Sequence, residues 1–75
     1  MDSSQSGTAI TPRQREILCR HVAGQTDQQI AAELMLSPAS IKSERMRLYR
    51  KLRARDRASL AVAAVRAGII DKPEE

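Results

Sequence analysis

Four signals for the start of a helix lie between Thr11 and Asp56, and this crowding constrains the fold more than any other feature. Thr11 and Ser37 are each followed by proline, which suits the first position of a helix because its backbone angle is fixed and its N–H is missing. Thr26 precedes Gln29 by three residues, as in a capping box. Asp56 opens an apolar, alanine-rich stretch. No segment alternates as a strand does. The sequence therefore predicts an all-α domain with helices at about 12–23, 27–34, 38–53 and 57–67.

The second and third predicted helices are joined by only three residues, 35–37. A short helix, a tight turn and a longer helix form the helix-turn-helix layout. Ala31 is small enough for the point where the two helices cross, and Ile41 supplies the apolar contact from the third helix. A generic helical bundle with a tight turn is the alternative at this stage.

The length of 75 residues allows one small domain and leaves little chain to enclose an active site. We expect a flexible linker at 1–9, the helix-turn-helix domain at 10–70 and a C-terminal tail at 71–75. No apolar run is long enough to cross a membrane. The single cysteine, Cys19, has no partner for an internal disulfide and is expected in the core. We expect a cytoplasmic protein that is not an enzyme and has no cofactor, metal or small-molecule ligand.

The positive charge is concentrated in one segment. The chain carries 13 basic and 9 acidic residues, a net charge of +4. Residues 38–57 hold eight of the basic residues and only Glu44 and Asp56 as acids, which gives this segment +6. Such a segment favours a polyanionic partner, although a solvated helix face is the simpler alternative. Tyr49 is the only aromatic residue apart from His21, so we do not expect bases to stack on aromatic side chains.

The third predicted helix separates an apolar stripe from a polar face. At about 100° per residue, Ile41, Leu48 and Leu52 share the stripe, with Arg45 among them. The opposite face is positive and chemically mixed, as a helix in the major groove requires. We assign base reading to Lys42, Ser43, Met46 and Arg47. We assign phosphate contacts to Arg50, Lys51 and Arg53, although Arg47 and Arg50 can each contact either a base or a phosphate.

Several segments resemble one family of bacterial regulators. Residues 10–18, ITPRQREIL, resemble LTPREREVL, and residues 23–31, AGQTDQQIA, resemble A-x-G-x-S/T-N-K-E-I-A. Residues 37–42, SPASIK, resemble S-x-x-T-V-K, and residues 48–52, LYRKL, resemble I-Y-R-K-L. These motifs are similar to those of the LuxR/FixJ-type, or GerE-type, helix-turn-helix of bacterial transcription regulators, and they cover about residues 10–70.

This resemblance implies sequence-specific binding of double-stranded DNA in transcription regulation, on the nucleoid when bound. It implies a homodimer with the third helix in the major groove and the fourth helix at the dimer contact. By position, Lys42, Ser43 and Met46 are implied as base readers, and Thr26 and Ser40 as phosphate contacts.

Several residues depart from the family pattern, among them Met46, which removes a possible cation from the reading face. Met35 replaces the glycine of the turn, where a left-handed backbone costs a methionine about 1–2 kcal/mol. Glu44 stands where the family commonly has histidine, and we expect it to pair along the helix with Lys51 or Arg47. We expect Arg45 to lay its stem along apolar neighbours and to place its guanidinium at Glu16 or in solvent.

The fourth predicted helix has two apolar regions. Leu60, Ala64 and Ala67 form a stripe suited to the core. Outside it lies a patch suited to weak self-association about a two-fold axis, made by Ala61, Val62 and Val65. The alternative function is a sigma-region-4-like or other helical protein-interaction module that acts mainly through RNA polymerase. The presence of a fourth helix argues against it, because such a domain normally stops soon after the recognition helix.

Overall fold

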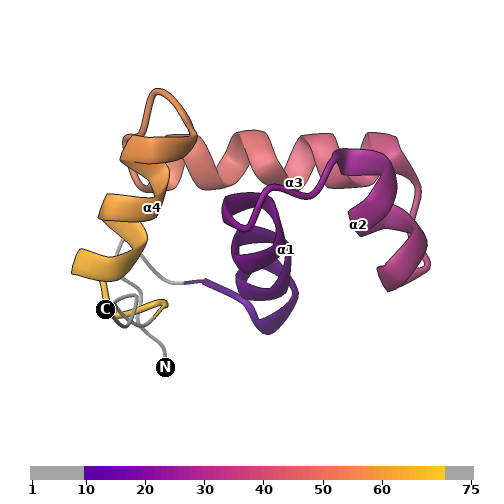
Figure 1. Cartoon of the computed structure of the whole chain (residues 1–75), viewed down its shortest axis with the longest axis horizontal. Helices are drawn as coiled ribbons and strands as arrows, with labels where there is room; N and C mark the ends of the chain where they lie inside the picture. Colours follow the sequence, from indigo (N-terminus) through magenta and orange to yellow (C-terminus); the bar gives the residue numbers. More distant parts are fainter. Residues whose placement is uncertain (1–9, 71–75) are drawn as a thin grey trace.

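The computed structural model describes residues 10–70, which form four helices: α1 (Pro12–Val22), α2 (Asp27–Leu34), α3 (Pro38–Lys51) and α4 (Arg57–Arg66). No strand occurs within these residues, so the predicted all-α fold is confirmed. In Figure 1, α3 runs along the long axis, and α1, α2 and α4 all lie to one side of it. The predicted linker at 1–9 and tail at 71–75 lie outside the described residues.

The four predicted helix starts are confirmed. The side chains of Thr11, Thr26, Ser37 and Asp56 each accept a hydrogen bond from the backbone N–H three residues later, at 2.8–3.1 Å. Each such cap stabilises the domain by about 0.5–2 kcal/mol relative to alanine, because it satisfies an amide that has no partner within the helix. The caps therefore fix where each helix begins.

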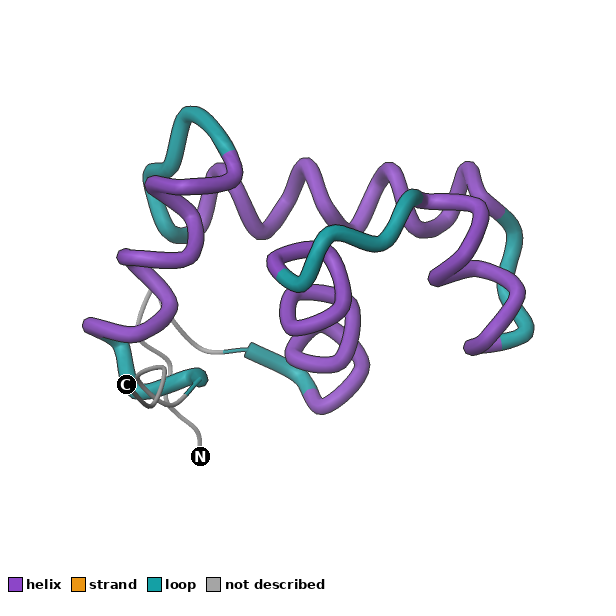
Figure 2. Tube along the Cα trace, in the orientation of Figure 1, coloured by secondary structure: helices purple, strands orange, loops and turns teal. Residues whose placement is uncertain are grey.

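Three of the predicted helix ends are one or two residues too long. The clearest case is α3, which ends at Lys51 rather than at Arg53. Arg53 adopts a left-handed backbone (φ 54°), and the next amide, that of Ala54, donates to the carbonyl of Tyr49 at 2.9 Å. The loop that follows leads into α4 (Figure 2). Arg53 thus belongs to a turn, and no glycine marks this helix end in the sequence.

Met35 has the left-handed backbone that a glycine would adopt in the turn between α2 and α3, with φ 60° and ψ 43°. Its amide and that of Leu36 both donate to the carbonyl of Ala31. The methionine side chain is 90% exposed and therefore gains little from packing. The turn keeps its geometry and carries a conformational cost of about 1–2 kcal/mol.

The core takes residues from all four helices. The predicted stripe on α3, comprising Ile41, Leu48 and Leu52, is buried against the others. The remaining buried apolar residues are Ile17, Leu18, Ile30, Ala31, Leu60, Ala64 and Ile69. The core therefore holds one side of α3 fixed along most of its length.

Two residues predicted in the core are exposed instead. Cys19 follows Leu18 by about 100° around α1, which turns its thiol away from the buried side. Ala67 caps the end of α4, and the chain then turns at Gly68 (φ 76°). This turn brings Ile69 into the core in place of Ala67.

Candidate nucleic-acid interface

The side of α3 opposite its buried stripe is open to solvent. Lys42, Ser43, Met46 and Arg47, the predicted base readers, are all exposed on it. Met46 has 49% of its surface accessible, so it is not a core residue. No helix covers this side in Figure 1. The predicted base readers are thus brought together on one accessible helix face.

Two predicted phosphate contacts lie at helix N-termini. The hydroxyl of Thr26 accepts from the amide of Gln29 at 3.1 Å at the start of α2. At the start of α3, the Ser37 hydroxyl donates to the Ser40 hydroxyl at 3.0 Å. Thr26 and Ser40 are both exposed. Amides and the helix dipole at such ends favour an anion, and a hydroxyl that accepts one hydrogen bond can still donate another.

The three predicted phosphate-binding cations lie in different surroundings. Arg50 is exposed on the same side of α3 as Met46. Lys51 is half-buried, and its Nζ donates to Oε1 of Gln14 at 3.2 Å, which directs the ammonium towards the start of α1. Arg53 is exposed in the turn beyond the helix. Arg50 alone of these three shares the open helix face with the predicted base readers.

Gln14 is a buried polar residue that sequence analysis missed. Its Nε2 donates to Oε1 of Glu44 at 3.1 Å, and its Oε1 accepts from Lys51 and from the amide of Thr11. Glu44 was expected to pair along its own helix, but its carboxylate accepts this hydrogen bond from α1. The spacing of Gln14, Leu18 and His21 on one face of α1 is the signal that predicts its burial. Gln14 thus holds one flank of α3.

Asp27 and Arg45 hold the other flank of α3. The guanidinium donates twice to the carboxylate, from Nε to Oδ1 at 3.0 Å and from Nη2 to Oδ2 at 2.8 Å. The expected partner, Glu16, instead binds Arg20, which also contacts Glu33. This hydrogen bonding lowers the pKa of Asp27 and raises that of Arg45. Asp27 is therefore ionised at neutral pH and fixes the start of α2 against α3.

A buried histidine joins α1 to the same flank. Nε2 of His21 lies 2.8 Å from the hydroxyl of Tyr49, and the two rings meet edge to face with centroids 5.6 Å apart. Burial lowers the pKa of His21, and the charges of Arg57 and Arg45 lower it further. The neutral imidazole is therefore the form that the fold favours. No role was predicted for this residue from the sequence, although its burial is again indicated by the spacing on α1.

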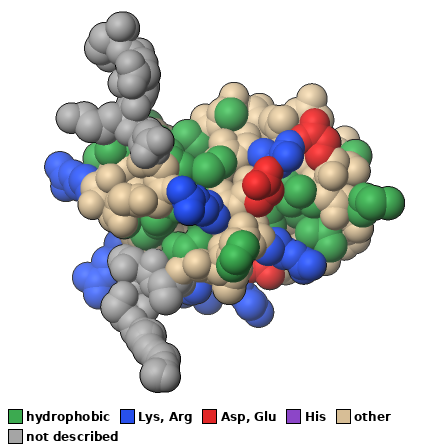
Figure 3. All heavy atoms as spheres, turned by 90° about the horizontal axis from the view of Figure 1, so that it is seen from below, with side chains coloured by type: hydrophobic (Ala, Val, Ile, Leu, Met, Phe, Trp, Pro, Cys, Tyr) green, Lys and Arg blue, Asp and Glu red, His purple; other side chains and the backbone are tan. Residues whose placement is uncertain are grey.

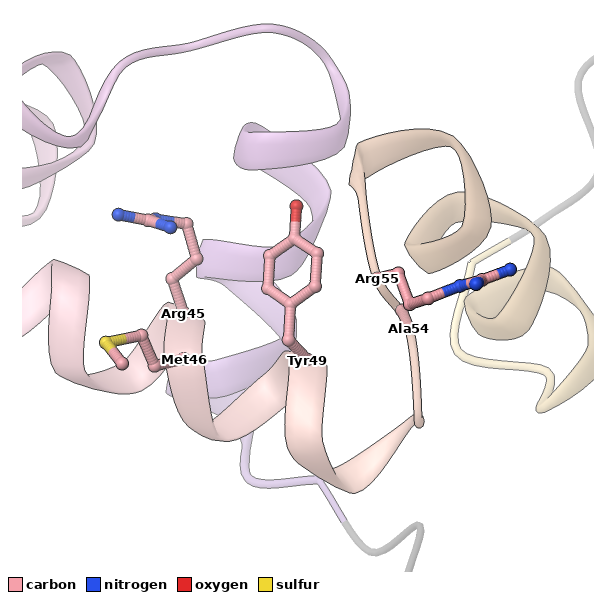
Figure 4. A pocket seen from close by; sticks show the side chains of 5 residues that line it. All are labelled: Arg45, Met46, Tyr49, Ala54 and Arg55. Carbon is pink, nitrogen blue, oxygen red and sulfur yellow. The ribbon is translucent and has the colours of Figure 1, made fainter.

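A shallow groove runs beside Tyr49. It has a volume of about 380 Å³ and is lined by Arg45, Met46, Tyr49, Ala54 and Arg55. Figure 4 shows that the guanidinium groups of Arg45 and Arg55 extend away from the tyrosine ring in opposite directions. The groove adjoins the open face of α3, because Met46 belongs to both.

The rest of the described surface has a different character. Residues 12–37 hold three basic and three acidic residues. Figure 3 shows the side of the molecule away from α3, where acidic and basic side chains lie next to one another.

On α4, Val62 is 53% exposed, and Ala61 and Val65 are half-buried. No described helix is long and apolar enough to cross a membrane. No cluster of metal-ligating side chains occurs within residues 10–70.

Comparisons with known proteins agree with this architecture. Residues 8–64 match the model of a family described as bacterial regulatory proteins, luxR family. The chain is 40% identical over 62 residues to the probable transcriptional regulatory protein NarL from two strains of Mycobacterium tuberculosis. The match covers 83% of this chain and 29% of each relative. No solved structure matches the chain. Because the family model covers well over half of its residues, the chain belongs to the luxR family of bacterial regulatory proteins and is a luxR-type helix-turn-helix domain.

Proposed function

We propose that this chain binds double-stranded DNA in transcription regulation, and that α3 enters the major groove with its open face towards the base edges. The observation that carries the proposal is the contrast between the two sides of α3. One side is buried in the core, and the other presents Lys42, Ser43, Met46 and Arg47 with no other helix of residues 10–70 over them. The major groove is about 12 Å wide and admits one such helix. Family membership supports the general function.

The chemistry of the face suits base edges. Lys42 and Arg47 can donate to O6 and N7 of guanine, and the arginine can do so with two hydrogen bonds. The hydroxyl of Ser43 can donate or accept, and the thioether of Met46 can pack on a thymine methyl group. An apolar contact beside cationic donors favours mixed sequences over uniform runs of one base pair. These assignments predict sequence preference as well as affinity.

The proposed phosphate contacts lie around this face. The exposed hydroxyls of Thr26 and Ser40 lie at the N-termini of α2 and α3, and Arg50 and Arg53 extend the positive surface beyond the base-reading residues. Lys51 is held towards α1 by Gln14 and would contact a strand that passes on that flank. Such contacts orient the domain on the duplex without reading sequence.

A salt titration of duplex binding tests the proposal. With about four to six phosphate contacts, log K should fall against log salt with a slope of about −4 to −6. The absence of duplex binding at low salt would overturn the proposal. It would favour the helical protein-interaction module acting through RNA polymerase.

We further propose that α4 joins two copies into a weak homodimer. Ala61, Val62 and Val65 leave an apolar surface on α4 that the core does not use. Sedimentation with and without DNA tests this assignment. Val65→Glu should abolish the dimer, whereas Ala67→Glu introduces the same charge at an exposed position off the patch and should leave it intact. A wild-type chain that remains monomeric on DNA would contradict the proposal.

A further inference from the structure

Arg45 differs from the other cations that α3 places near the open face. Its guanidinium makes two hydrogen bonds to the carboxylate of Asp27, and both side chains are about one-quarter exposed (25% and 27%). Two parallel hydrogen bonds hold an arginine in a defined direction. The charge of Arg45 is therefore directed at α2 rather than into solvent.

The pair lies beside the proposed interface. Arg45 and Met46 line the same groove, and Met46 also belongs to the base-reading face. Lys42 is close enough for its charge to lower the pKa of Asp27. Asp27 directly follows Thr26, whose hydroxyl is proposed to contact a phosphate. The carboxylate thus lies among cations on the flank that a DNA strand would approach.

We propose that Asp27 withholds Arg45 from DNA phosphates and so lowers the affinity of the domain for DNA of any sequence, which makes Asp27 a specificity-determining residue. The inference rests on the proposed function, because it concerns the same helix face. Phosphate contacts strengthen binding to every sequence, whereas base contacts strengthen binding only to the preferred one. Keeping one arginine away from the phosphates therefore raises the ratio of the affinity for preferred DNA to the affinity for random DNA.

The groove beside Tyr49 gives a released Arg45 a place to turn. It is open to solvent along the edge of the interface, and Arg45 already forms part of its lining (Figure 4). Without the carboxylate, the guanidinium can swing towards a strand passing along this flank. The site would then gain a cation and lose an anion that repels the phosphate near Thr26.

Asp27→Asn tests the inference on the full chain with a mixed-sequence DNA duplex as the probe. Asparagine has nearly the same size and shape as aspartate, so the variant should fold. We expect tighter binding and a salt slope steeper by about 1. One extra phosphate contact makes the gain about threefold larger at 50 mM than at 200 mM salt. Glu33→Gln is the matched control, because it also removes one negative charge and one ion pair from α2, but on the side facing Arg20.

Two substitutions of Arg45 extend the test, and Arg45→Lys separates this role from simple support of the fold. Arg45→Gln breaks the same pair but leaves the carboxylate unpaired, so binding should weaken. Arg45→Lys keeps the net charge and loses the paired geometry, so binding should tighten, though less than in Asp27→Asn. It also tests the inference if Asp27→Asn does not fold. Asp27→Glu retains a carboxylate and should leave both affinity and slope near wild type.

The outcomes distinguish this inference from the proposed function. If the wild-type chain shows no salt-dependent duplex binding, the proposed function fails. If the wild-type chain binds as expected but Asp27→Asn binds no more tightly than Glu33→Gln, only the inference is overturned. Weaker binding by Asp27→Asn would likewise overturn it, because a purely structural role for the pair predicts that direction.

Discussion

The two faces of α3 belong to one helix of 14 residues, but one face must pack in the core and the other must stay accessible. On one face, Ile41 and Leu48 are fully buried and must fit neighbours from α1 and α2. On the other, Lys42 and Arg47 are exposed to solvent. We therefore expect that stability and recognition can be changed separately on this helix. Leu48 and Lys42 are the positions at which this separation can be tested.

The largest effect is expected on the buried face. Leu48→Ala should lower the free energy of unfolding by about 2–5 kcal/mol, because a fully buried side chain leaves a cavity that cannot fully close. Met46→Ala, on the open face, should change it by less than about 0.5 kcal/mol. Urea denaturation followed by circular dichroism measures both. Equal losses in the two variants would show that the faces are not separable.

On the open face we expect a smaller effect, and we expect it in DNA binding rather than in the free energy of unfolding. Lys42→Ala should weaken binding to a preferred sequence by about 1–3 kcal/mol if Lys42 reads a base, and should weaken binding to all sequences equally if it contacts phosphate. The urea midpoint should not move. Arg13→Ala removes one exposed cation from α1 and serves as the control. Fluorescence anisotropy with preferred and random duplexes gives both affinities, and an unchanged affinity for both would refute the interface.

The turn before α3 offers a test of stability away from both faces. Met35→Gly should stabilise the domain by about 1 kcal/mol, because glycine adopts φ 60° without steric cost and the lost side chain is almost fully exposed. Met35→Ala keeps the Cβ atom and should give no such gain. Thermal unfolding compares the three chains. A loss of stability in the glycine variant would mean that the methionine makes contacts that offset its backbone strain.

The smallest effect is expected in the pH dependence of stability, through the contact of His21 on α1 with Tyr49 on α3. His21 is the chain's only histidine, and its pKa in the fold is lowered by burial. The unfolded chain therefore binds the proton first, and stability should fall as pH drops below about 6.5, the ordinary histidine value. Urea midpoints at about pH 7.5 and 5.5 measure the change. His21→Gln should remove it, and a wild-type midpoint that rises on acidification would contradict the direction of the shift.

The helices and the two faces of α3 were predictable because their signals are local. A cap such as Thr26 and the amide it binds are three residues apart, and the stripe of Ile41, Leu48 and Leu52 follows from helical periodicity alone. The end of α3 was predicted less well, because Arg53 takes a left-handed backbone without a glycine to announce it.

The supports on the flanks of α3 were not predictable in the same way. Arg45 finds Asp27 at a separation of 18 residues, His21 finds Tyr49 at 28, and Gln14 finds Glu44 at 30. Each pairing depends on how the helices pack, and several partners of suitable charge were available from the sequence. Glu16 was the expected partner of Arg45, yet the packing of α2 places Asp27 there instead. The predicted base-reading residues on α3 follow from helical periodicity, whereas the side chains that support this helix are known only from the fold.

The most direct test of the central claim is protection of DNA from methylation by dimethyl sulfate. The reagent attacks N7 of guanine, which lies in the major groove, and N3 of adenine, which lies in the minor groove. If α3 enters the major groove, the wild-type chain should protect guanine N7 within its preferred site, and Lys42→Ala should reduce that protection. Protection of adenine N3 with guanine N7 left fully reactive would contradict the account.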